Sequence, residues 1–113
     1  VLDISGGNVN IDLSVAQSFT LAVDADVSQF TLLNPPTGAT AFSILITQDS
    51  TGGHSVGIAT FKTSGGTDID VKFPAGGVLP IVTTTADKTD IYSFKTFDGG
   101  TTLFGVVGGQ NFA

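Results

Sequence analysis

Hydrophobic and polar residues alternate along most of this chain with a period of two. Val9, Ile11 and Leu13, for example, alternate with Asn10 and Asp12. This spacing places apolar side chains on one face of an extended strand and polar ones on the other. The pattern predicts strands near 9–13, 19–23, 30–33, 42–47, 55–61, 69–73, 79–84, 89–97 and 102–107, with the most apolar of them, 42–47, at the centre of a sheet.

Glycine pairs and prolines mark the turns between these strands. Residues 49–53 and 98–101 combine Asp with Gly-Gly and predict two hairpin turns, whereas Asn34-Pro35-Pro36 predicts an irregular loop. Eight or nine short strands favour an all-β fold, a jelly-roll-like two-sheet antiparallel sandwich of about eight short strands; an immunoglobulin-like sandwich is the alternative. We expect one domain over residues 1–113, with a short N-terminal arm at residues 1–6.

Composition supports the all-β prediction. The chain has fifteen Gly but no Glu, Arg, Met, Trp or Cys, so most strong helix formers are missing. Because cysteine is absent, disulfides and thiolate metal sites are excluded, and the redox compartment is not indicated.

The charge of the chain bears on its partners. Ten acidic residues and four basic ones give a net charge of −6, which repels phosphate backbones and anionic membranes. The apolar runs are also far shorter than the roughly 20 residues that a membrane-spanning helix requires. We therefore expect no nucleic-acid or membrane partner.

Candidate chemistry is sparse. The one histidine, His54, follows Gly52-Gly53 and has Asp49 as its nearest acid, so we interpret it as a turn residue. The pairs Asp24/Asp26 and Asp68/Asp70 offer carboxylates for Ca²⁺ but do not continue into an EF-hand pattern. No nucleophile elbow or phosphate-binding loop is present. The sequence predicts no catalytic, cofactor or metal residues and a protein that is not an enzyme.

The aromatic residues are expected mainly in the core, as is usual for strands of alternating character. Tyr92 and Phe94 share one face of a predicted strand, and Phe97 falls on the other. At least one aromatic side chain near the turn at 98–100 should therefore lie at the surface, where it indicates a contact.

Several segments, in order, resemble a recurrent β-module of tailed-phage virion proteins, found in capsid decoration (cement) proteins and in the C-terminal domains of tail fibres. The most specific match is Phe42–His54, and the chain closes similarly, from Thr83 through the turn at 98–102 to Phe112. Other matching segments are Gly7–Ser14, Phe19–Leu21, Asn34–Gly38 and Phe73–Gly77. Ile58, Phe73 and Leu103 stand where family members usually carry Trp, and about eight residues are inserted near 63–70.

The resemblance implies a structural protein of the virion. A decoration protein on the capsid exterior, which trimerises and clamps neighbouring major capsid subunits, is the first interpretation. The alternative is the receptor-binding tip of a tail fibre, joined to the fibre shaft and recognising a host surface glycan. In either role we expect capsid or oligomer contacts at the chain ends and the rim, with the apolar N-terminal arm free to reach a neighbour. The expected contact residues are Val1, Leu2, Ile4, Phe97, Leu103, Phe104 and Phe112.

Overall fold

The computed structural model describes residues 2–112, and nine strands account for most of their regular structure. The all-β prediction is confirmed. The strands are β1 (Ile4–Ser5), β2 (Asn8–Asp12), β3 (Ser18–Val23), β4 (Gln29–Leu33), β5 (Thr40–Gln48), β6 (Phe61–Thr63), β7 (Asp68–Lys72), β8 (Thr89–Thr96) and β9 (Thr102–Phe112). One four-residue element, α1 (Pro74–Gly77), is a single turn in which Ala75 and Gly76 have left-handed backbone angles.

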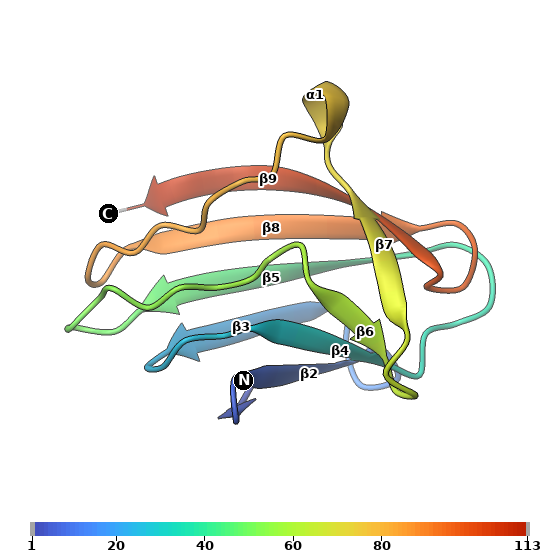
Figure 1. Ribbon diagram of the computed structural model, residues 1–113, viewed down its shortest axis with the longest axis horizontal. Helices are drawn as coiled ribbons and strands as arrows, with labels where there is room; N and C mark the ends of the chain where they lie inside the picture. Colours follow the sequence, from blue (N-terminus) through green and yellow to red (C-terminus); the bar gives the residue numbers. More distant parts are fainter. Residues whose placement is uncertain (1, 113) are drawn as a thin grey trace.

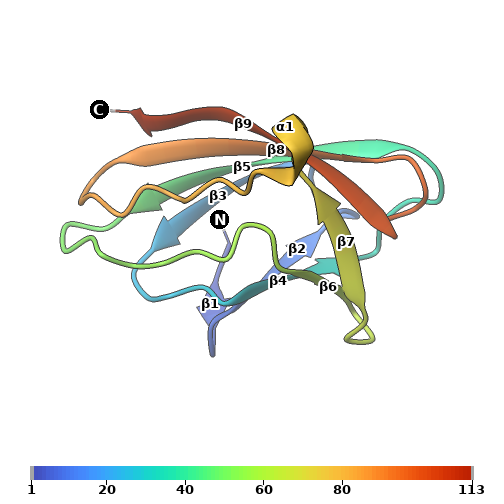
Figure 2. The ribbon, with the colours of Figure 1, turned by 45° about the horizontal axis from the view of Figure 1, so that its top comes forward.

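All nine strands form one sheet, in the order β1-β2-β4-β6-β7-β9-β8-β5-β3, that curls into a barrel-like sandwich (Figure 1). Figure 2 shows two walls, with β1, β2, β4 and β6 on one side and β3, β5, β8 and β9 on the other. β7 crosses between the walls. The two end strands of this order, β1 and β3, nearly meet. Leu2, just before β1, forms an isolated bridge with Leu21 of β3.

The pairing is mixed, which corrects the expectation of a purely antiparallel sandwich. β2 pairs with β4, β3 with β5, β4 with β6 and β7 with β9 in parallel, and the remaining four pairs are antiparallel. The cause is that β2 to β6 lie alternately in one wall and the other (Figure 2). Strands two apart in sequence therefore become neighbours that run in the same direction.

One of the two predicted hairpins is confirmed. β8 and β9 pair antiparallel across the turn at 97–101, where the Thr96 hydroxyl accepts from Gly100 N and Asp98 Oδ1 accepts from Thr102 N. These hydrogen bonds join neighbouring residues, which is why the sequence predicts the turn, and Gly99 N also donates to Gly38 O of a distant loop at 3.0 Å.

The hairpin expected at 49–53 is wrong. The chain after Gly53 does not return along β5; instead Val56 bridges Val27. The loop is held against a distant turn, since Gly53 N donates to Thr84 O at 2.7 Å and Asp87 N to Asp49 O at 3.1 Å. The Gly-Gly turn at 52–53 therefore packs against the distant turn at 84–87 and does not join two paired strands.

The strand expected at 79–84 is also absent from the described residues. The left-handed α1 turn redirects the chain, and Pro80 has no backbone N–H to donate to a ladder. Of this segment only Val82 reaches the core, whereas Ile81 is 85% exposed.

Five phenylalanines occupy the core between the walls, as expected for most aromatic residues. The Phe61 and Phe94 ring centroids lie 4.9 Å apart, and Phe30, Phe42 and Phe73 pack on these two rings. These rings join the two walls into one core. The apolar strand β5 is paired on both sides, with β3 and with β8, as predicted for an interior strand.

Candidate interaction surface

The N-terminal arm is not free, contrary to expectation. Leu2 N donates to Thr20 O at 2.8 Å, and Ile4 pairs with Val9 of β2. Leu2 and Ile4 are both half-buried against the core, and Val1 lies outside the described residues. The arm therefore bridges the seam between β2 and β3, and its apolar side chains are used within the fold.

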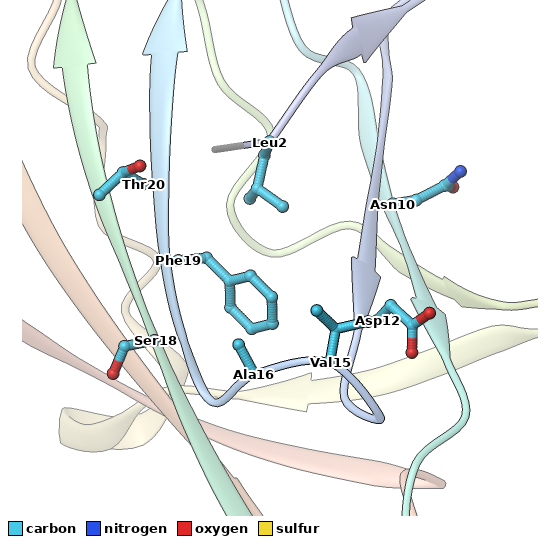
Figure 3. A pocket seen from close by; sticks show the side chains of 8 residues that line it. All are labelled: Leu2, Asn10, Asp12, Val15, Ala16, Ser18, Phe19 and Thr20. Atoms are coloured by element: carbon cyan, nitrogen blue, oxygen red, sulfur yellow. The ribbon is translucent and has the colours of Figure 1, made fainter.

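A hollow remains in this seam beyond Leu2 (Figure 3). The Phe19 ring points into it from β3, with Leu2 above and Val15 and Ala16 below. Its other lining residues are polar, from Asn10 and Asp12 of β2 and from Ser18 and Thr20 of β3.

Large apolar side chains are exposed on the outer face of β9 and beside it. We call this surface the β9 strip and define it by Phe97, Phe104, Val106 and Val78; Val107, the next residue of the strand, points to the other face. The Phe97 and Phe104 rings pack edge to face with their centroids 6.0 Å apart, and Phe97 is 61% exposed. Val106, which is 50% exposed, and Val78, which is 67% exposed, continue the strip on the other side of Phe104. Large apolar side chains gathered in this way are uncommon on a monomer and typically mark an interface.

Two adjoining hollows lie between β9 and residues 73–80. The first is lined by Phe73, Pro74 and β9 residues 104–106, together with Lys72. The second is lined by Phe73, Pro74, Ala75, Val78, Pro80, Val106 and Val107. They share the Phe73–Pro74 corner, and we call the two together the β9 groove. In Figure 1, α1 projects beyond β9 next to this groove.

The predicted contact residues separate into three groups. Phe97 and Phe104 lie together in the β9 strip, and Phe112 is exposed at the far end of β9, with its ring against Gly109. Leu103 has 0% exposure, which corrects its assignment to a contact surface: it lies on the inner face of β9, while Phe104 lies on the outer face. Leu2 and Ile4 belong to the seam.

Val78, Val106 and Val107 are exposed although none of them is among the predicted contact residues. The prediction of a strand at 79–84 conceals that the segment just after α1 leaves apolar side chains exposed. The signal available in the sequence was Pro80 directly after an apolar pair that follows Gly76-Gly77.

The electrostatic setting of the β9 strip is unusual for so acidic a chain. No carboxylate lines either hollow. Lys72 lines the first hollow and forms an ion pair with exposed Asp70 at 3.1 Å, and Lys95 Nζ lies 5.0 Å from the Phe97 ring centroid. The surface is therefore apolar, with Lys72 and Lys95 at its border.

The one deeply buried acid is fully engaged by the fold. Asp90 accepts hydrogen bonds from Tyr92 Oη at 2.8 Å, Thr83 N at 2.7 Å and Asn111 N at 2.8 Å. Burial opposes ionisation, but these donors hold the pKa of Asp90 below its usual range. Burial, together with the Asp90 contact, raises the pKa of Tyr92. This cluster stabilises the region where 81–83, β8 and β9 meet.

His54 lies beside Asp49, as its position in sequence suggested. Its Nε2 is 3.2 Å from Asp49 Oδ1, while Asp49 also accepts from Thr51 N and Gly52 N. The Gly52 amide is the main reason that the pKa of Asp49 is lowered. This arrangement orders the loop at 48–54. Within residues 2–112 no group of three or more His, Cys, Asp or Glu side chains is placed to hold a metal ion.

The described part of the chain contains no helix long and apolar enough to cross a membrane. Comparison with known proteins adds no assignment: no family model, no curated protein and no solved structure matches this chain.

Proposed function

We propose that this chain is a non-catalytic structural protein of a tailed-phage virion, a decoration protein that binds the capsid exterior and bridges neighbouring major capsid subunits. The observation that carries the binding role is the β9 strip, an apolar surface without carboxylates on an otherwise acidic molecule. The resemblance of residues 42–54 and 83–112 to phage virion modules supplies the setting.

The mechanism is the burial of apolar area across a seam between subunits. The strip gathers large apolar side chains that are about half exposed or more, and a contiguous exposed apolar patch is commonly functional. Burying apolar area contributes about 25 cal/mol per Å², so each bound copy opposes separation of the subunits that it contacts. No chemical step is involved.

Self-association is part of the proposal, with three copies implied by the resemblance. The outer faces of β3, β5 and β8 form a surface with small, hydroxyl and aliphatic side chains and one charged group, Lys95. Its members are Ser18, Thr20, Ala22, Ala41, Ser43, Leu45, Thr47, Thr89, Ile91, Ser93 and Lys95. Two acidic copies can bring such faces together without opposing carboxylates.

Particle stability tests the proposal. Phage heads stripped of the protein should burst at a lower temperature, and adding it back should restore the original value. Val106→Asp places a charge in the strip and should abolish the restoration. Val15→Asp is the matched control, because Val15 is 76% exposed but lies outside the strip. Heads whose burst temperature does not change when the protein is removed would exclude decoration.

A tail-fibre tip is the other role that the resemblance leaves open. In that case the protein would be present in a few to tens of copies per particle rather than hundreds. Val106→Asp would leave head stability unchanged, and substitutions near 98–102 would abolish adsorption to cells that carry the host glycan. Copy number and adsorption therefore separate the two roles.

A further inference from the structure

Most of one edge of β9 has no neighbouring strand. β7 pairs with β9 only through residues 102–104, whereas β9 continues to Phe112. Within residues 2–112 no strand continues the ladder on that side beyond Phe104. Such an edge presents backbone donors and acceptors to any chain that can add a strand.

The orientation of the free groups follows from the pairing with β7. Thr101 O accepts from Asp70 N at 3.3 Å, so the carbonyl of Thr101 points toward β7. Backbone groups of successive strand residues point alternately to the two sides, which turns Leu103, Gly105 and Val107 to the β7 side and Phe104 and Val106 toward β8. The register pairs Lys72 with Phe104, so the N–H of buried Gly105 meets the C=O of Lys72 at the end of β7. Beyond this point, the N–H and C=O of Val107 face the open edge.

Nothing in the strand blocks this edge. Natural sheets usually protect an edge with lysine, proline or an inward-pointing charge. Residues 102–112 contain no charged residue and no proline. The edge strand β3 at one end of the sheet is by contrast partly covered by Leu2.

The β9 groove runs along this same edge. Its two hollows adjoin β9 residues 104–106 and 106–107 in turn, and both are lined mainly by apolar side chains. When a peptide is added to a sheet edge, main-chain hydrogen bonds provide affinity and pockets receive alternate side chains. The open edge and the two consecutive hollows have this arrangement.

We infer that the edge of β9 beyond Phe104 accepts an extended segment of the capsid protein as an added strand, with apolar side chains at alternate positions in the β9 groove and an acidic residue near Lys72. The inference rests on the proposed decoration function and specifies how the shell is bound. Val107 would supply the main-chain hydrogen bonds. Phe73, Pro74 and Val78 would receive the side chains.

Lys72, the charged residue that lines the groove, favours this occupant over a second copy of the chain. Lys72 lines the groove, and its partner Asp70 forms an exposed ion pair, which is typically weak. A second β9 strand would bring no carboxylate to Lys72, since residues 102–112 have none. An acidic residue in the added segment would complement it and favour encounter with this edge.

The test uses Val107→Pro, which removes an N–H that faces the open edge without removing one that pairs with β8. Proline is tolerated at such edge positions. Val107→Thr is the matched control, because it keeps the β-branched shape and the N–H. We expect Val107→Pro to fold but to bind stripped heads at least tenfold more weakly, and Val107→Thr to bind within threefold of the unsubstituted protein.

Hydrogen exchange of the unsubstituted protein gives a second measurement. It tests strand addition even in the event that Val107→Pro does not fold. The amide of Val107 should exchange readily in the free protein and become protected on stripped heads. Head binding with this amide still unprotected, or equal binding by Val107→Pro, would overturn strand addition while leaving decoration intact. Protection of the edge amide in a concentrated solution of the protein without heads would show that a second copy of the chain occupies the edge. Failure of the unsubstituted protein to bind heads would instead refute the decoration function.

Discussion

The Phe73 ring lies so close to Gly105 that a β-carbon at position 105 would be 2.6 Å from Phe73 Cε1. Phe73 is buried and packs against Phe94, so it has little room to move. We therefore expect Gly105→Ala to lower the free energy of unfolding by about 1–3 kcal/mol through overpacking. Denaturant titration measures this. Gly65→Ala is the control, since its β-carbon would meet nothing closer than 3.9 Å; similar losses for both variants would contradict the packing argument.

Leu103 and Phe104 are adjacent in sequence but should have different mutational effects. Leu103→Ala removes a fully buried side chain and should lower the free energy of unfolding by about 2–5 kcal/mol. Phe104→Ala removes a half-exposed ring and should lower it by less, while weakening attachment to heads. Thermal melts and a pelleting assay with stripped heads distinguish the two variants. A Phe104→Ala protein that attaches normally would remove this residue from the contact surface.

Asp90 should make stability depend on acid pH. Its folded-state pKa lies below the unfolded value, so the ionised carboxylate stabilises the fold above about pH 4, and this contribution is lost as pH falls through the folded-state pKa. Asp90→Asn should lower the free energy of unfolding by about 1–3 kcal/mol at pH 7, and the two stability curves should converge in acid. Asp24→Asn, at an exposed site, should leave the curve unchanged. Parallel curves for Asp90→Asn and the unsubstituted protein would show that the effect is not ionic.

Deleting residues 1–5 should destabilise the fold, because Leu2 and Ile4 pack on the core and Leu2 bonds to Thr20. The loss of two half-buried aliphatic side chains corresponds to about 2–3 kcal/mol. Hydrogen exchange should also show faster exchange in β2 and β3, on both sides of the opened seam. Replacing Asp3 alone by Asn tests the specificity, since this side chain is exposed. A deletion variant as stable as the full chain would mean that the seam does not need its bridging strand.

The sequence predicts those parts of the fold that depend on local residues. Strands such as β2 follow from the alternation of Val9 and Ile11, and the turn between β8 and β9 follows from Asp98-Gly99-Gly100. The parallel neighbours are not predictable in this way, because the pairing of Phe30 with Phe61 depends on where the intervening strands lie. Local patterns identify a strand but not its partner.

The contact surface was only partly predictable for the same reason. Phe97 and Phe104 could be expected at the surface from their positions beside a turn, and the structure brings their rings together. Leu103 and Val106 both lie in an apolar strand, but Leu103 is on its inner face and Val106 on its outer face with Phe104. Which of the two apolar faces is covered depends on tertiary structure, which no window of sequence contains.

The parallel pairing also constrains how the protein is made. β7 is flanked by β6, made shortly before it, and by β9, made later than the other eight strands described. β5 likewise has β3 on one side but must wait for β8 on the other. A nascent chain therefore cannot complete the wall of β3, β5, β8 and β9 until the last two of these strands have left the ribosome, although β1, β2, β4 and β6 are made earlier. The core should close late, with the apolar faces of the early strands exposed to chaperones in the meantime.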